Sequence, residues 1–100
     1  MNVSVVDFAG SFAENKDRAR DVRESQLRPA LQRGESVTID FEGVGLATQS
    51  FVHALISDLI RSPGLDALDR VKFANCDSDV KTIISIVVEY SQEDAYLDDE

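Results

Sequence analysis

Four side chains capable of acid, base or nucleophilic chemistry lie close together in the sequence: Asp40, Glu42, Ser50 and His53. Asp40 and Glu42 are two residues apart, so both carboxylates would face the same side of a strand, and two carboxylates can divide acid and base roles in a cleft. Ser50 and His53 are three residues apart, a spacing that permits contact on a helix. One hypothesis is therefore a small enzyme or nucleotide-binding protein that uses these four residues. The alternative is a solvated strand end beside a surface or half-buried histidine.

The loop between these two pairs reads Glu-Gly-Val-Gly-Leu-Ala-Thr-Gln-Ser. Its glycines permit backbone conformations that other residues avoid, and Thr48, Gln49 and Ser50 bring polar groups to the start of the next helix. The loop lacks the third glycine of a dinucleotide-binding motif and the Lys-Ser/Thr pair of a phosphate-binding loop. Two interpretations remain: Thr48 or Ser50 caps the helix while Leu46 fills the core, or the loop contacts a partner.

A single cysteine, Cys76, leaves no partner for an internal disulfide, and with one histidine the chain has too few ligands for a zinc site. The neighbouring Asp77 and Asp79 would raise the pKa of the thiol, which argues against a nucleophilic cysteine. We therefore expect no metal or other cofactor, and a reducing, cytoplasmic location. The longest apolar stretch, 83–88, is interrupted by Ser85 and is far too short to cross a membrane.

The net charge of -9 argues against non-specific binding to nucleic acid or to anionic membranes. The charge is unevenly distributed, because residues 16–33 carry six basic and three acidic groups whereas residues 51–100 carry four basic and eleven acidic groups. The basic segment is either a solvated helix with internal ion pairs or a contact for an acidic partner surface. A second copy of the chain could supply that acidic surface, so a self-associating homodimer is a further alternative.

Hydrophobic periodicity predicts three strands and three helices in alternation. Pro29 lies inside the first helix, where it removes one hydrogen bond, so we expect a kink or a break into two shorter helices. The expected elements are a strand at 2–8, a helix from Asn15 or Asp17 to Arg33, a strand at 36–41, a helix at 50–61, a strand at 71–75 and a helix that begins at Asp77 or Ser78.

This alternation predicts an α/β fold with a small, mainly parallel sheet of three to four strands in βαβαβα order. At 100 residues the chain is long enough for one hydrophobic core, so we expect a single domain over residues 1–92. Residues 93–100 contain five carboxylates and are expected to form a flexible acidic tail.

Three segments resemble the STAS-like domains of bacteria that are known only as a domain of unknown function. They are Val-Thr-Ile-Asp-Phe-Glu-Gly-Val at 37–44, Thr-Gln-Ser-Phe-Val at 48–52 and Val-Lys-Phe-Ala-Asn at 71–75. The family pattern has a strand that ends Asp-Phe-x-Gly-Val, a short loop, Thr/Ser-x-Ser-Phe at the start of a helix, and a later strand that ends in Asn. The likeness covers residues 18–90 and implies a STAS-like fold.

The chain is more distantly similar to STAS domains proper, the anti-sigma factor antagonists. Those proteins bind a histidine-kinase-like ATPase, which phosphorylates a serine in an Asp-Ser-Ser-Gly loop and so switches the partner. That loop corresponds here to Thr48-Gln49-Ser50-Phe51, where Ser50 matches the second serine and Gln49 stands at the usual phospho-acceptor. The resemblance implies a non-enzymatic regulatory module that binds a protein partner, with Ser50 or Thr48 as phospho-acceptor. The implied contact residues are Gly43, Val44, Gly45, Thr48, Gln49, Ser50 and His53.

Overall fold

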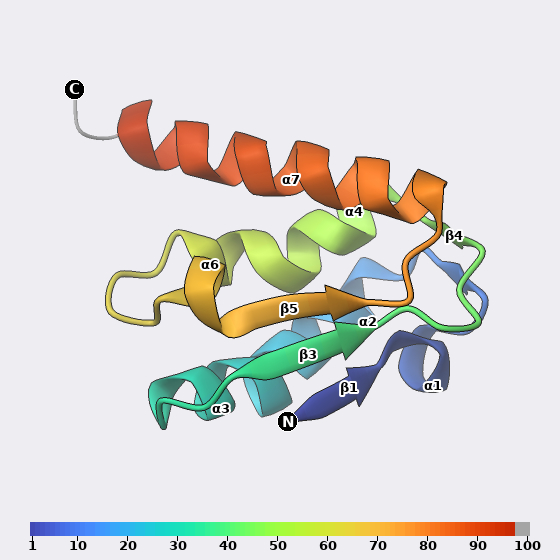
Figure 1. The fold of residues 1–100 in the computed structure, drawn as a ribbon, viewed down its shortest axis with the longest axis horizontal. Coiled ribbons are helices and arrows are strands. Elements are labelled where there is room, and N and C mark those ends of the chain that lie inside the picture. Colours follow the sequence, from blue (N-terminus) through green and yellow to red (C-terminus); the bar gives the residue numbers. More distant parts are fainter. Residues whose placement is uncertain (98–100) are drawn as a thin grey trace.

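The computed structural model describes the backbone of residues 1–97 and the side chains of residues 1–92. Three parallel strands form the main sheet in the order β1-β3-β5, and helical segments connect them, so the predicted α/β fold with a small parallel sheet is confirmed (Figure 1). The strands of this sheet are β1 (Asn2–Ser4), β3 (Val37–Asp40) and β5 (Val71–Ala74). A second parallel pair comprises β2 (Phe12–Ala13) and β4 (Leu46–Ala47).

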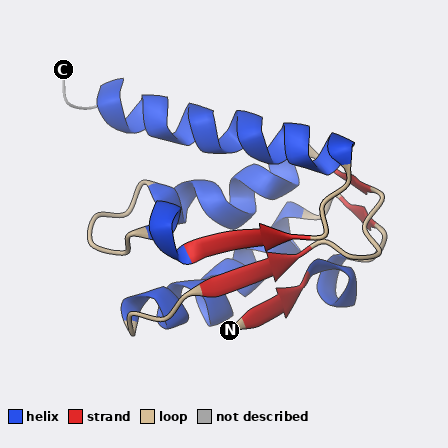
Figure 2. Cartoon of the chain, in the orientation of Figure 1, coloured by secondary structure: helices blue, strands red, loops and turns tan. Residues whose placement is uncertain are grey.

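The helices pack on one face of the main sheet. Val3, Ile39 and Phe73 are register partners across the three strands, and they point into the core with Val37. The alternate residues face away from the helices and are exposed or half-buried. Figure 2 shows the strands in front of the helices, with the last helix beyond the β5 side of the sheet. The uncovered face carries Asn2, Ser4, Thr38, Asp40, Lys72 and Ala74.

The first predicted element is wrong in its second half. The predicted strand at 2–8 ends at Ser4, and residues Val5–Ala9 form a short helix, α1. Helical spacing lets Val5 enter the core while Phe8 stacks on Phe51, with ring centroids 6.0 Å apart. Tertiary packing therefore overrides the preference of the valine-rich segment for strand.

The first long helix is continuous across Pro29. It comprises α2 (Lys16–Val22), a π-helical turn η1 (Arg23–Leu27) and α3 (Arg28–Gln32). In the π turn the Arg28 amide donates to the Arg23 carbonyl, five residues back, and Pro29 then lies in the first turn of α3, where an N–H is not required. The wider turn accommodates the proline, so the helix does not split in two.

The other predicted elements are confirmed with small shifts. The helix predicted at 50–61 comprises α4 (Gln49–Val52), a second π turn η2 (His53–Ser57) and α5 (Asp58–Ile60). The last helix, α7, spans Ser78–Leu97, so its backbone continues into residues 93–97, which were expected to belong to a flexible tail. Residues 98–100 of that expected tail lie outside the described part of the chain. The sequence did not indicate β2, β4 or the short helix α6 (Ala67–Arg70). None of the helices within residues 1–97 has the length and apolar content needed to cross a membrane.

Candidate functional site: an interaction surface and a basic pocket

An exposed apolar pair lies on the small β2–β4 sheet. Phe12 and Leu46 are register partners, and they are 48% and 46% exposed. The next pair in the register, Ala13 and Ala47, is buried, so the two short strands turn their small residues inward and their large apolar residues outward. Leu46 was expected to fill the core, and that expectation is wrong. The pair is instead an apolar surface at the carboxyl end of the main sheet.

The predicted contact loop is held against β2 and the residue before it, Ser11. The Gly45 amide donates to the Ser11 carbonyl at 2.9 Å, and the Thr48 amide donates to the Ala13 carbonyl at the same distance. Gly43 has a φ of 85°, which favours glycine, and a Cβ there would lie 3.4 Å from the Val6 side chain. These contacts fix the course of the loop between β3 and β4.

The residues expected to bind a partner differ in what they present. Gly43, Gly45, Gln49, Ser50 and His53 are exposed. The Val44 side chain is only 5% exposed and belongs to the core, so at that position a partner could reach little beyond the backbone.

Thr48 caps the second long helix, which comprises α4, η2 and α5. Its hydroxyl oxygen accepts a hydrogen bond from the Phe51 amide at 3.1 Å, as an N-cap residue does. Of the two capping candidates, Thr48 therefore fulfils the structural role, and Ser50 lies exposed in the first turn of α4.

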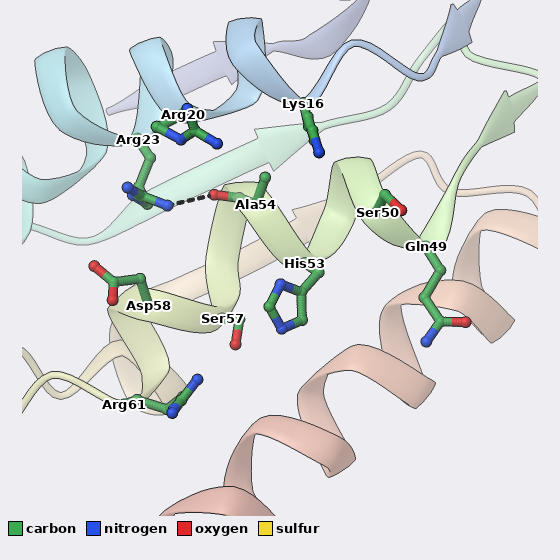
Figure 3. Close-up of a pocket in the computed structure, with 10 residues that line it drawn as sticks. All are labelled: Lys16, Arg20, Arg23, Gln49, Ser50, His53, Ala54, Ser57, Asp58 and Arg61. Atoms are coloured by element: carbon green, nitrogen blue, oxygen red, sulfur yellow. Dashed lines mark hydrogen bonds between the residues drawn. The ribbon is translucent and has the colours of Figure 1, made fainter.

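A basic pocket lies between the two long helices, beside this helix start. It has a volume of about 640 Å³ (Figure 3). Three of the predicted contact residues, Gln49, Ser50 and His53, line it, and Figure 3 shows the His53 ring between Ser50 and Ser57. The other lining residues are Lys16, Arg20, Arg23, Ala54, Ser57, Asp58 and Arg61.

The charge of this pocket differs from that of the whole chain. Four of its ten lining residues are lysine or arginine and one is acidic, which gives a net +3 in a chain of net charge -9. The locally basic helix noted in the sequence supplies three of the cations: Lys16, Arg20 and Arg23. The fourth, Arg61, follows the second long helix, and the sequence pattern did not associate it with the others.

Both π turns contribute to the pocket, and a side chain joins them. Arg23, in η1, donates from Nη1 to the carbonyl oxygen of Ala54, in η2, at 2.8 Å, and from Nε to Glu24 at 2.7 Å. Hydrogen bonds from Arg23 and then from Arg28 hold the pKa of Glu24 below its ordinary value. The Arg28 guanidinium also pairs with Asp58, the one acidic residue in the lining.

The four residues of the catalytic hypothesis do not share this pocket. Ser50 and His53 line it, whereas Asp40 and Glu42 do not. The Asp40 carboxylate accepts hydrogen bonds from the Asn75 side chain and the Glu42 amide, each at 2.9 Å. These bonds, that from Asn75 foremost, hold the pKa of Asp40 below its ordinary value. Asp40 therefore links the ends of β3 and β5.

The Cys76 thiol has the properties of a structural cysteine. It is half-buried, with Sγ 3.7 Å from the Ala74 carbonyl oxygen, and burial, with smaller contributions from Asp77 and Asp40, raises its pKa. A raised pKa disfavours the reactive thiolate.

Within the described residues, no group of three or more His, Cys, Asp or Glu side chains is placed to hold a metal ion.

The fold and the site define a small parallel α/β domain in which a short loop leads from a central strand to an exposed helix start. The family described as a STAS-like domain of unknown function (DUF4325) matches residues 18–81, and the chain belongs to that family. The match includes the first long helix from Arg18 onward, β3, the contact loop, the second long helix and β5. No curated protein and no solved structure matches the chain significantly.

Proposed function

We propose that the protein is a non-enzymatic regulatory module that binds a protein partner through one surface. This interaction surface comprises the exposed Phe12–Leu46 pair and the exposed polar residues Gln49, Ser50 and His53. The predicted contact glycines, Gly43 and Gly45, lie in the loop that leads to it.

The exposed Phe12–Leu46 pair is the observation that carries the proposal. Large apolar side chains, aromatic ones above all, provide most of the binding energy when a partner covers them. Phe12 and Leu46 lie side by side, so one partner group can cover both. Thr48 begins the helix directly after β4, so Ser50, in the first turn, follows Leu46 by four residues. An apolar centre with a polar rim is the usual composition of a protein interface.

The resemblance to anti-sigma factor antagonists supports a histidine-kinase-like ATPase as the partner. Ser50 is then the preferred phospho-acceptor, because its hydroxyl is exposed whereas that of Thr48 is engaged in capping. A phosphate on Ser50 would add about -1.5 to -2 charges beside the basic pocket. It would therefore lower the positive charge that an acidic partner meets.

Affinity capture from the native host tests the proposal with a matched pair of variants. Leu46→Asp places a charge in the interaction surface, whereas Leu68→Asp places one on α6, at the opposite end of the sheet; the two leucines are 46% and 53% exposed. We expect one protein to be retained by the wild type and by Leu68→Asp, and lost by Leu46→Asp. Equal retention by both variants would remove the interaction surface from the account.

The homodimer alternative has its own measurement. Light scattering at low and high salt tests the homodimer alternative, because a dimer held by the basic helix would dissociate as salt screens its charges. The small-enzyme alternative required Asp40, Glu42, Ser50 and His53 in one site, and the lining of the pocket does not supply that arrangement.

A further inference from the structure

We propose that the open edge of β5 is a docking site for an extended peptide segment of another protein, which adds a strand to the main sheet. The groove that receives the peptide lies between β5 and α7 and shares no lining residue with the interaction surface. This inference goes beyond the proposed function, because it assigns a second surface and a partner that is recognised through its backbone.

β5 is an edge strand, and one of its sides is unpaired. Among the described strands it pairs only with β3. The Ala74 carbonyl accepts a hydrogen bond from the Phe41 amide at 2.9 Å, so Ala74 directs its backbone groups toward β3. Alternate residues of a parallel strand direct their backbone groups to opposite sides, so the N–H and C=O of Phe73 point to the open edge. An edge of this kind is a template for another strand.

An apolar cavity of about 320 Å³ borders this edge. Its described lining comes from β5, α7, the second long helix and α6; nine of the ten residues are apolar, and the tenth is Ser85. Figure 1 shows α7 beyond the open edge of β5 and α6 at the start of the strand. The volume is at the lower end of the range for ligand pockets, so the cavity suits a large apolar side chain.

The exposure of one row of the sheet shows that the groove opens at β5. Val3, Ile39 and Phe73 are register partners on the face that the helices cover. Val3, on the other edge strand, is 5% exposed and Ile39 is fully buried, whereas Phe73 is only half-buried. The helices therefore cover the β1 edge more completely than the β5 edge, and an added strand would complete the burial of Phe73.

A second cavity, of about 480 Å³, continues the groove toward the carboxyl end of β5. The residues that line both cavities are Phe73, Ile84 and Ser85. Asn75 and Lys81 also line the second cavity, and Lys81 is the one charged residue in the described lining of either. An acidic side chain of the peptide would complement this lysine.

The two cavities match the side-chain spacing of an added strand. Residues i and i+2 of a strand point to the same face, about 6.5–7 Å apart. The first cavity adjoins Val71 and Phe73, and the second adjoins Phe73 and Asn75, so they follow β5 in steps of two residues. One peptide can therefore place an apolar side chain in the first cavity and an acidic one beside Lys81. Backbone bonds to the edge supply affinity in this mode, and the side-chain pockets supply specificity.

A peptide fits this edge better than the same edge of a second copy does. Each copy carries its own α7 beyond β5, so the pairing of two β5 edges would bring both α7 helices into the space that the pairing needs. A peptide without a flanking helix meets no such obstacle.

Titration with synthetic peptides, followed by amide chemical shifts, tests the site. The probes are seven-residue threonine peptides that carry a leucine and a glutamate two positions apart, as Leu-Thr-Glu and as Glu-Thr-Leu, because the edge can accept either strand direction. We expect one order to bind more tightly and so to fix the direction. Replacing its leucine by serine should weaken binding at least about tenfold, since the apolar side chain no longer fills the cavity.

A matched pair of variants on α7 locates the binding site. Ser85→Glu places a charged side chain where the two cavities meet, whereas Thr82→Glu places one on the same helix outside both. Both positions are exposed, so both variants should fold, which thermal unfolding verifies. We expect Ser85→Glu to bind the peptide at least about tenfold more weakly than wild type, and Thr82→Glu to stay within about twofold.

Hydrogen exchange distinguishes strand addition from a contact between side chains alone. The bound peptide should slow exchange of the Phe73 amide, because that N–H gains a partner, and should leave the Ala74 amide, which already faces β3, little changed. Binding without protection of Phe73 would overturn the proposal. So would the absence of binding in either order, or equal weakening by Ser85→Glu and Thr82→Glu.

Two further results separate this site from other occupants and from the interaction surface. Self-association of the wild type that Ser85→Glu abolishes would assign the groove to a second copy and overturn the peptide proposal. Leu68 lines the apolar cavity, so Leu68→Asp should weaken peptide binding and keep the partner of the interaction surface, whereas Leu46→Asp should do the reverse. A failure of one proposal is therefore distinguishable from a failure of the other.

Discussion

Arg23 donates a hydrogen bond from Nη1 to the carbonyl oxygen of Ala54 at 2.8 Å, and this contact joins the π turns of the two long helices. The two residues are 31 positions apart in the sequence. Both residues line the basic pocket, so the bond joins its two walls. One side chain therefore both builds the site and charges it.

Replacing Arg23 by methionine should destabilise the fold by about 1–2 kcal/mol, because its hydrogen bonds to Ala54 and Glu24 are lost while the aliphatic packing is kept. Arg20→Met is the control, and it should change the free energy of unfolding by less than about 0.5 kcal/mol, since Arg20 is 54% exposed and its pair with the exposed Asp17 is weak. Urea denaturation of both variants measures the difference. Equal effects would show that the Arg23–Ala54 bond has no special role.

The capping role of Thr48 leads to a prediction that separates it from Ser50. Thr48→Ala should lower the free energy of unfolding by about 0.5–2 kcal/mol, and Thr48→Ser should retain most of the stability because serine is an equally good cap. Ser50→Ala removes an exposed hydroxyl and should have little effect. Chemical denaturation of the three variants tests the assignment. A larger loss for Ser50→Ala than for Thr48→Ala would reverse it.

A buried pair of hydroxyls joins α7 to the second long helix. Ser57 and Ser91 are 2% and 0% exposed, their oxygens are 2.9 Å apart, and Ser91 also donates to the Val87 carbonyl at 2.7 Å. Ser91→Ala leaves the Ser57 hydroxyl buried without this partner and should cost about 1–3 kcal/mol. The double replacement by alanine should cost less than the sum of the two single ones. Strict additivity of the measured unfolding free energies would show that the hydroxyls do not interact.

Asp40 should titrate below its ordinary pKa, because its carboxylate accepts hydrogen bonds from Asn75 and from the Glu42 amide. A group whose pKa is lowered on folding stabilises the fold above its unfolded pKa, and this stabilisation is lost as the pH falls through the folded pKa. Asn75→Gly removes the amide yet tolerates the φ of 55° at that position, so it should raise the pKa of Asp40 and weaken this acid dependence. NMR titration of the carboxyl carbon measures both proteins, and an unchanged pKa would contradict the assignment.

The sequence predicted the elements whose pattern is local and regular. β3 alternates buried and half-buried residues as expected, and the apolar face of the second long helix is buried as expected. The prediction failed where packing between distant segments decides the outcome. Val5 and Phe8 form part of a helix because the core receives them in that geometry, and β2 and β4 are too short to have a period.

The candidate site was predictable only in part, for the same reason. The polar residues at the helix start followed from the loop sequence, and the basic character of the first helix followed from its composition. Their meeting in one pocket with Arg61 depends on how two helices pack, which no local pattern encodes. The exposure of Leu46 likewise depends on its pairing with Phe12.

The affinity of the captured and purified partner for three forms of the protein tests the central claim most directly. The account predicts that Leu46→Asp, in the interaction surface, weakens binding at least about tenfold, as expected for a residue at the centre of an interface. Leu68→Asp should leave the dissociation constant within about twofold of the wild type, because an exposed residue outside an interface contributes little. Equal affinities of all three forms, or a loss confined to Leu68→Asp, would contradict the account.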